Sequence, residues 1–220
     1  MKKKIESDFI FMLLISSLLL VSCEKESCLP TDGDGNEYDT IVIGSQVWLA
    51  EDLKTTKYNN GVSIPLVTDN TQWSSMSSAA FCWYDNIAND KGNYGALYNQ
   101  WAVNVTFLCP AGYHVPDDEE WNILINHLGG EELAGAKLKV TGRQFWNNNS
   151  DQTTNESGFS AMPGGWRDPN DGLFLDIRIR GSWWSATPGH RVDIRGTENS
   201  AYLMGLSPKS GFSVRCTKNK

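Results

Sequence analysis

A long stretch without regular periodicity constrains this chain more than any other feature. Residues 142–196 are rich in Gly, Asn, Asp, Pro and Trp, and they show little of the periodicity that indicates a helix or a strand. A compact domain seldom carries so long a stretch without secondary structure unless the stretch binds something or covers a site. We therefore expect the rest of the chain to supply the scaffold, and this region to supply the function.

The scaffold is predicted to have strands at both ends. Short β-rich runs occur at four places, which are residues 40–43, 46–49, 201–206 and 212–216. The first two are separated only by Gly44-Ser45, which predicts a β-hairpin. Residues 71–101 are rich in Trp and Tyr but mixed in period, and we assign them to no element.

One segment between these ends predicts an amphipathic helix. In residues 116–130 apolar side chains recur at the helical spacing, and Asp117 with Glu120 forms a capping box. A pair of glycines closes the segment and predicts its end. A second short helix is expected over residues 131–139. Terminal strands that flank helices and a long loop region predict an α+β domain without internal repeats.

The start of the chain has the layout of an exported lipoprotein. A basic start precedes an apolar run at residues 9–21, which is too short for a comfortable transmembrane helix. The sequence LVSC at residues 20–23 resembles a bacterial lipobox. We expect cleavage before Cys23, acyl chains on its thiol, and membrane attachment through that lipid anchor only.

These features divide the chain into three parts. Residues 1–22 are the expected signal peptide, and residues 23–36 are polar, contain Pro and Gly, and predict a lipidated tether. Residues 37–220 then form the domain. The expected location is the cell envelope, as an outer-membrane lipoprotein that is periplasmic or surface-exposed.

The charge balance narrows the choice of partner. The chain has 19 Lys and Arg against 26 Asp and Glu, a formal net charge of -7. An acidic domain is poorly suited to bind nucleic acid or to adhere to anionic lipid by charge. We expect a neutral or weakly charged partner and no nucleic acid.

Four cysteines remain once Cys23 is assigned to lipid. In an exported domain they suggest two disulfides, and the sequence leaves all three connectivities open among Cys28, Cys82, Cys109 and Cys216. No Cys/His pattern has zinc spacing.

The irregular region supplies the candidate ligand-binding residues. Flat aromatic rings can stack on the C–H faces of sugars, while neighbouring amides, carboxylates and guanidinium groups bond hydroxyls. The candidates are Trp146, Asn147, Asn148, Trp166, Arg167, Asp168 and His190. We expect Trp48, Trp83, Trp101 and Trp121 to fill the core, and Trp183 and Trp184 to hold the loop region in place.

No catalytic motif accompanies these residues. The three histidines are paired with no nucleophile, and we expect His114 to be a hydrogen-bonded structural residue and His127 to be solvated. The acidic run that begins at Asp117 is favoured by the helix dipole without any catalysis. We therefore expect no enzyme and no catalytic residues.

No cofactor is expected, although calcium is possible. Asp32 begins an alternating oxygen pattern, but the EF-hand positions for Gly and Glu hold Glu37 and Ile43. Looser calcium sites are conceivable around residues 147–151 or at Asp168 and Asp171, where the simpler interpretation is a solvated polar turn.

Several longer motifs carry a resemblance to a known family. They are DGNEYDTIVIGSQVWLAEDL (34–53), FCWYDN (81–86), YGALYNQWAV (94–103), LCPAGYHVPDDEEW (108–121), SGFSAMPGGWR (157–167), WWSAT (183–187) and GFSVRC (211–216). Together they resemble the Fibrobacter succinogenes major paralogous domain over nearly the whole mature chain. The family's biochemical role is not established.

A more distant resemblance concerns the fold. Residues 112–130 and 211–216 are similar to stretches of the formylglycine-generating enzyme family. Both resemblances imply a C-type-lectin-like domain with paired terminal strands, two helices and a long irregular loop region. The enzymes use a cysteine pair in that region, whereas residues 141–215 contain no cysteine.

Three hypotheses on function follow. The first is a non-catalytic surface module that binds a glycan or another surface macromolecule. The second is a structural or adhesin-like protein with protein partners. The third is a modifying enzyme that uses Cys82.

Overall fold

The computed structural model describes residues 29–88, 94–147 and 152–220. Its strands are β1 (Thr40–Ile43), β2 (Gln46–Leu49), β3 (Phe81–Cys82), β4 (Leu97–Tyr98), β5 (Tyr113–His114), β6 (Trp166–Arg167), β7 (Phe174–Leu175), β8 (Arg180–Trp184), β9 (His190–Arg195), β10 (Ala201–Gly205) and β11 (Thr217–Lys218). Its helices are α1 (Asn70–Ser75), the 3-10 turn η1 (Tyr84–Asn86), α3 (Gln100–Val103), α4 (Asp118–His127) and α5 (Glu131–Leu138). This mixture of helices and small antiparallel sheets is an α+β fold, as the sequence predicts.

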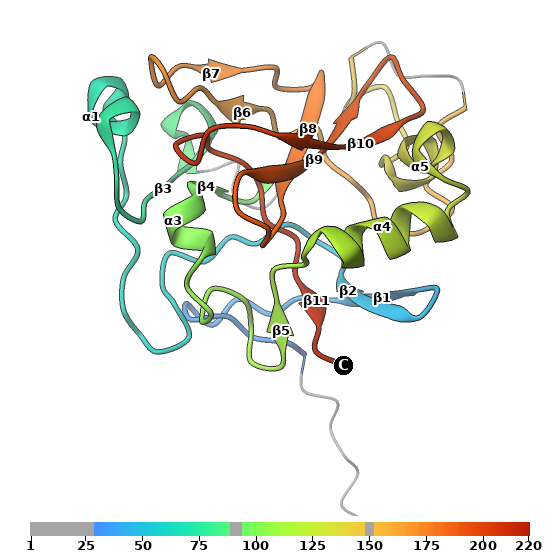
Figure 1. Ribbon diagram of the computed structural model, residues 1–220, viewed down its shortest axis with the longest axis horizontal. Helices are drawn as coiled ribbons and strands as arrows, with labels where there is room; N and C mark the ends of the chain where they lie inside the picture. Colours follow the sequence, from blue (N-terminus) through green and yellow to red (C-terminus); the bar gives the residue numbers. More distant parts are fainter. Residues whose placement is uncertain (1–28, 89–93, 148–151) are drawn as a thin grey trace, which may run out of the picture.

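Two sheets organise the domain. The lower sheet in Figure 1 has the order β1-β2-β11-β5, so the C-terminal strand pairs with the N-terminal hairpin. The upper sheet has the order β10-β9-β8, and α4 and α5 lie beside it on the right of the view. Two smaller pairs, β3-β4 and β6-β7, complete the left half. β10 is the edge strand of the upper sheet on the side of the helices.

The predicted local elements at both ends of the scaffold are confirmed. β1 and β2 pair in antiparallel register through a turn in which Gly44 has φ 60°, a backbone conformation that favours glycine. α4 begins with the expected capping box: the Asp117 side chain accepts from the Glu120 N–H, and the Glu120 side chain accepts from the Asp117 N–H. α5 begins at the residue predicted for the second helix and ends at Leu138, one residue before the predicted end.

Most of the tryptophans fill the core. One cluster joins both sheets to α4, with the Trp48 and Trp121 ring centroids 4.8 Å apart. A second cluster lies around Tyr98 and Phe212 in the left half and includes the buried Trp184. Trp183 is buried as well, in the first cluster. Both halves are therefore held by aromatic packing.

One disulfide joins two distant parts of the chain. Cys109 and Cys216 are bonded across a sequence separation of 107 residues, and closing so long a loop restricts the unfolded chain. Cys82 is a free, buried thiol, so the disulfide expected for this residue is not formed. Cys28 lies outside the described residues.

The upper sheet corrects the prediction of a uniformly irregular region. β8 and β9 both fall within residues 142–196, and they pair over their length from Arg180↔Arg195 to Trp184↔Arg191. Residues 191–195 of β9 do alternate between polar and apolar side chains, a strand signal that the prediction overlooked. β8 has no such alternation, because its residues 181–184 are all buried whatever their polarity.

The predicted strand at residues 212–216 is also corrected. Gly211, Phe212 and Ser213 each form a single bridge, to Arg167, Tyr98 and Trp183 respectively. Because three different segments share this stretch, no ladder extends along it. Regular pairing resumes only at β11.

The folded domain begins earlier than the predicted tether boundary. The Tyr38 hydroxyl donates to Asp32 Oδ2 at 2.5 Å, and Asp32 is buried. Asp34 forms an ion pair with Lys57 at 3.3 Å. Residues 30–36 are therefore packed against the body of the domain. Within the described ranges, no helix has the length and apolar content needed to cross a bilayer.

Candidate functional site

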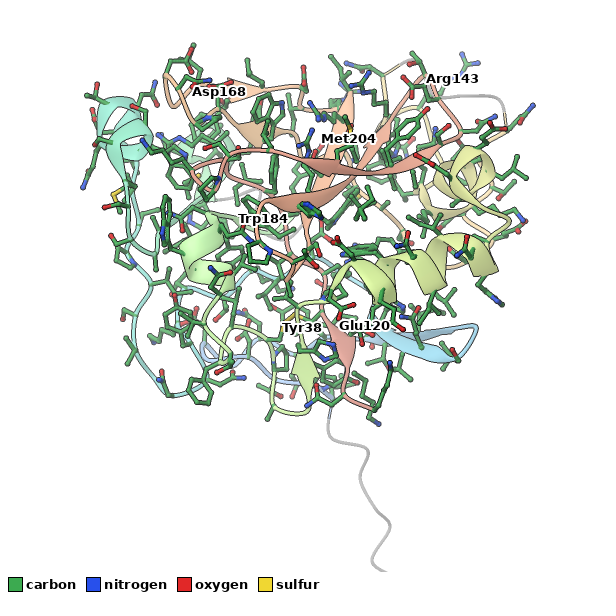
Figure 2. All side chains as sticks on the ribbon, in the orientation of Figure 1. Tyr38, Glu120, Arg143, Asp168, Trp184 and Met204 are labelled. Atoms are coloured by element: carbon green, nitrogen blue, oxygen red, sulfur yellow. A yellow bond between two sulfur atoms is a disulfide. The ribbon has the colours of Figure 1, made fainter. Side chains whose placement is uncertain are left out.

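The hairpin of β9 and β10 presents two different faces. Its register pairs Tyr202 with Asp193 and Met204 with Arg191. Because successive side chains of a strand point to opposite faces, Ala201 and Leu203 pack toward the core while Tyr202 and Met204 lie on the other face. Figure 2 shows Met204 in the upper half of the molecule.

A groove follows the outer edge of β10. It consists of a pocket of about 330 Å³ lined by Glu131, Arg195, Glu198, Tyr202, Leu203 and Met204, and a pocket of about 170 Å³ lined by Asn122, Ile125, Asn126, Glu131, Ala201 and Leu203. Glu131 and Leu203 belong to both, so the two pockets are adjacent. We call these residues the β10 groove.

Ion pairs fix the charged side chains of the groove, and one of these pairs involves a buried carboxylate. Arg195 Nε lies 3.5 Å from Asp193 Oδ2, and Arg195 Nη1 lies 3.5 Å from Glu198 Oε1. Asp193 is fully buried, accepts from Ser182 Oγ at 2.7 Å and is also bonded by Arg180. The Arg195 side chain nevertheless remains 44% exposed. Its guanidinium is thus oriented by the buried carboxylate and open to a ligand.

α5 fixes the turn that carries these groups. A Cβ at Gly135 would lie 2.2 Å from the Ser200 carbonyl oxygen, so only glycine allows the helix to come so close to the turn. The Ala136 N–H donates to the Asn199 carbonyl at 2.9 Å. The start of β10 is therefore packed directly on the helix.

A buried lysine completes this support. Lys139 Nζ donates to the carbonyl oxygens of Arg195, Gly196 and Glu198, at 3.3, 3.1 and 2.7 Å. Burial lowers the pKa of Lys139 to about 8, while the Glu198 carboxylate opposes this shift. The turn that carries Arg195 and Glu198 is therefore tied to a single ammonium group.

This arrangement suits hydroxyl-rich ligands. The first pocket brings one phenol ring together with a guanidinium and two carboxylates, and the adjacent pocket adds two amides beside Ile125, with Leu203 lining both. A ring face can stack on a sugar, and planar polar groups can bond its hydroxyls. No His, Cys or Ser lines this groove within the described part of the chain.

Two of the residues predicted to bind ligand are in the core instead. Trp146 is 0% exposed, donates from Nε1 to the Ala161 carbonyl at 3.3 Å, and packs in the cluster around Trp48. Arg167 is also 0% exposed. Neither side chain can reach a surface ligand, because each is covered on all sides by the domain.

Arg167 instead joins two segments of backbone. Its guanidinium donates to the carbonyl oxygens of Val67, Thr68 and Gly172 at 2.6, 3.0 and 2.9 Å. It also lies 4.6 Å from the ring centroids of both Trp73 and Phe174. The side chain thus replaces the regular ladder that this part of the chain lacks.

The remaining loop candidates do not gather into one site. Trp166 is half-buried and donates from Nε1 to Asp176 Oδ2 at 2.9 Å. Asp168 is half-buried at the top left of Figure 2, and Asn147 is exposed on the surface. Asn148 lies outside the described residues. None of these side chains lines the β10 groove.

His190 lies at the opposite end of β9 from Arg195. Its Nδ1 is 2.5 Å from Asp118 Oδ2, in the first turn of α4, and the side chain is half-exposed. Ser185 Oγ donates to the other oxygen of Asp118 at 2.6 Å and so is bonded to the carboxylate, not to the histidine. These three residues therefore do not form a nucleophile with its base.

The other histidines behave as predicted. His114 contacts Asn219 Oδ1 through Nδ1 and Glu120 Oε2 through Nε2, both at 2.7 Å, which confirms a structural role. His127 is exposed on α4, as expected.

The possible calcium ligands satisfy their own turns. Asp168 Oδ1 accepts from the Asn170 N–H at 2.7 Å, and Asp171 Oδ1 accepts from the Leu173 N–H at 3.0 Å. Across residues 29–88, 94–147 and 152–220, no three His, Cys, Asp or Glu side chains gather as a metal site. Asn149 and Asp151 lie outside these ranges.

Cys82 has the environment of a structural thiol. It is fully buried, and burial raises its pKa to about 12, although the nearby Arg167 opposes this shift. A thiol rather than a thiolate is a weak nucleophile. The nucleophile named in the enzyme hypothesis is therefore buried in this structure, and burial favours its protonated form.

Sequence reasoning missed the β10 groove. The strand itself was predicted, and the alternation of Ala201 and Leu203 with Tyr202 and Met204 was the available signal. Arg195 joins Tyr202 through the pairing of β9 with β10, and Glu131 joins them only through the packing of α5 on the hairpin, which no local pattern reveals.

The fold and the groove define an α+β domain with a polar, aromatic groove at the edge of its second sheet. The family model of the Fibrobacter succinogenes major domain matches residues 41–218, and the chain belongs to this family. The match runs from β1 to β11 and includes every residue of the β10 groove, which confirms the resemblance found in the sequence. No curated protein and no solved structure is significantly similar to the chain.

Proposed function

We propose that this protein is a lipid-anchored envelope module that binds a glycan in the β10 groove. The observation that carries this proposal is that Tyr202 lines the same open pocket as Arg195, Glu131 and Glu198. The proposed ligand is a soluble or surface glycan, and the proposed role is recognition without catalysis.

The groove and the N-terminal segment lie at opposite ends of the domain, and this arrangement supports an anchored module. The first described residues lie at the bottom of Figure 1, whereas α5 and β10 lie in the upper half. Tyr38, which is bonded to the Pro30 carbonyl, is likewise at the bottom of Figure 2, far from Met204. A protein held through Cys23 would present the groove away from the bilayer.

The order of the elements supports a C-type-lectin-like organisation. The terminal strands share one sheet, the two longer helices α4 and α5 lie between the first hairpin and the second sheet, and two strands of that second sheet come from the long loop region. In this proposal the second sheet carries the ligand, and the loop residues around Trp146 serve as its core. Specificity then depends on the groove and not on the scaffold.

A protein partner is the second candidate. β10 is an edge strand, and an extended chain can pair with an exposed sheet edge by β-strand addition. This observation favours the adhesin-like hypothesis over an enzyme, and the partner would occupy the same groove.

A melting experiment on the full-length, lipidated protein tests the proposal. In detergent micelles, a glycan at a hundred times its dissociation constant adds about 2.7 kcal/mol of stability, which shifts the melting temperature. Parallel arms with calcium and with chelator determine whether the ion takes part.

Matched variants then locate the site. Tyr202→Ala and Arg195→Ala should abolish the shift, whereas His190→Ala, in the same sheet but outside the groove, should retain it. Binding that survives both groove variants contradicts this site. A glycan panel without any shift contradicts glycan binding and directs attention to a protein that pairs with β10.

A further inference from the structure

The end of the domain that carries the first described residues has exposed apolar side chains. Val62 is 57% exposed and Phe107 is 51% exposed. The Asn59 N–H donates to the Phe107 carbonyl at 2.8 Å, and the Tyr58 N–H donates to the Val62 carbonyl at 2.9 Å. The two apolar side chains therefore belong to adjacent turns. We call them the apolar tip.

The apolar tip lies beside the start of the described chain. Asp34 forms an ion pair with Lys57 at 3.3 Å and accepts a hydrogen bond from the Thr56 N–H. The turn that contains Val62 is thus attached to the segment that follows Leu29. The N-terminal segment, this turn and the Phe107 turn form one continuous end of the molecule.

The chain length limits how far this end can be from an anchor. Six peptide units separate Cys23 from Leu29. Since an extended chain covers at most about 3.6 Å per residue, Leu29 cannot be more than roughly 20 Å from an acylated Cys23. Two or more acyl chains hold that cysteine stably at the headgroup level of a membrane. The apolar tip therefore belongs to the end of the domain that the anchor holds near the lipid.

We propose that Val62 and Phe107 insert into the membrane interface beside the lipid anchor and hold the domain upright, with the β10 groove facing away. The inference rests on the proposed lipid anchor at Cys23. An exposed phenylalanine and valine gain free energy when they leave water for the boundary between headgroups and acyl chains. The contact sets the orientation of the domain, since the acyl chains already supply the attachment.

The charges at this end favour an apolar contact over an electrostatic one. Lys57 is paired with Asp34, and Lys54 is paired with Glu51 at 2.7 Å. Glu37 and Asp39 are exposed on the same segment. Because acidic groups outnumber the lysines here, anionic lipid would not attract this end, and the contact should form on uncharged phosphatidylcholine.

Photocrosslinking on the full-length, processed protein in phosphatidylcholine vesicles tests the inference. Phe107→benzoylphenylalanine is compared with Leu173→benzoylphenylalanine. Leu173 is 48% exposed, and its carbonyl accepts from the Asp168 N–H at the top of the view in Figure 2. We expect a lipid adduct at position 107 and none at position 173. A lipidated protein without an adduct at position 107, or with equal adducts at both positions, overturns the inference.

Two further measurements separate the possible failures. Mass spectrometry of the N-terminal peptide reports the acyl chains on Cys23, and their absence contradicts the anchor itself, together with the inference that depends on it. In vesicles, amide exchange of residues 58–63 should slow severalfold. The double variant Val62→Ser, Phe107→Ser should lose this protection, while Leu173→Ser should keep it. Equal protection in both variants contradicts a contact made by the apolar tip.

Discussion

Two regions of this molecule combine an arginine with aromatic rings, and they use the combination in opposite ways. Arg167 lies between the rings of Trp73 and Phe174, with no exposed surface. Arg195 lies beside Tyr202 in the β10 groove and is 44% exposed. The first guanidinium has backbone carbonyls as its partners, and the second is oriented by carboxylates and open to solvent.

The difference arises from what covers each strand. β6 and β7 form a short pair that packs over residues 67–73, so their arginine replaces missing backbone contacts. β10 is the edge strand of its sheet, and part of its outer edge borders the open groove. Residue type alone therefore does not distinguish a structural cluster from a binding surface.

The largest expected effect is the loss of the Arg167 guanidinium. Arg167→Met leaves the carbonyl groups of Val67, Thr68 and Gly172 buried without their donors. We expect the free energy of unfolding to fall by about 3–5 kcal/mol, as when one partner of a buried charged network is removed. Denaturant titration measures this loss.

Arg195→Met is the matched control for that comparison. Within the described part of the chain the exposed guanidinium forms two ion pairs, both at 3.5 Å, and we expect a stability change within about 1 kcal/mol. Binding of ligand should show the reverse order, with the Arg195 variant defective and the Arg167 variant competent at temperatures where it is folded. Similar stability losses in both variants would contradict the distinction between the two regions.

A smaller effect is expected at Lys139, which connects the core to the groove. Lys139→Met removes the donor for three carbonyl groups, and we expect a loss of about 1–3 kcal/mol near neutral pH. The turn that carries Arg195 and Glu198 should loosen as well, so ligand affinity should fall together with stability. Denaturant titration and the glycan melting shift measure the two changes.

The pH dependence of the free energy of unfolding tests whether Lys139 is the titrating group. Burial lowers the pKa of Lys139 from 10.5 to about 8, so the unfolded chain binds more protons between these values. The contribution of Lys139 to the free energy of unfolding should therefore rise with pH from 8 to 10, by up to about 1.4 kcal/mol per pH unit, and fall as the pH returns to 8. The raised pKa values of Cys82 and the buried tyrosines act in the opposite direction but equally in both proteins, so the rise appears as the difference between the wild-type protein and the Lys139→Met variant. Identical slopes in both proteins would contradict the assignment to Lys139.

The sequence predicted the elements that depend on local patterns. The capping box of Asp117 and Glu120, the glycine turn at Gly44 and the core position of Trp48 are all determined within a few residues or by strong burial. The chain's family was also recognisable from its motifs. These features need no knowledge of distant contacts.

The candidate site could not be predicted in the same way. Trp146 and Arg167 have the composition of a sugar-binding surface, and only the path of the backbone around them shows that they are covered. Glu131 and Tyr202 are far apart in sequence and meet because Gly135 lets α5 approach the hairpin. The pairing of Cys109 with Cys216 likewise depends on long-range topology and was left open.

The smallest effect sharpens the comparison within a single helical turn. Glu131 and Glu132 both lie in the first turn of α5, where the helix dipole favours negative charge. Glu131→Gln and Glu132→Gln should each lower the free energy of unfolding by about 0.3–1 kcal/mol.

The two variants should differ in ligand binding, because Glu131 lines the groove and Glu132 does not. With the Glu131 charge removed, Glu198 is the one carboxylate left among the described residues that line the groove with Arg195, so a sulfated glycan should gain affinity relative to its neutral counterpart. The Glu132 variant should leave that ratio unchanged, and an equal ratio in both variants would place the ligand outside the groove.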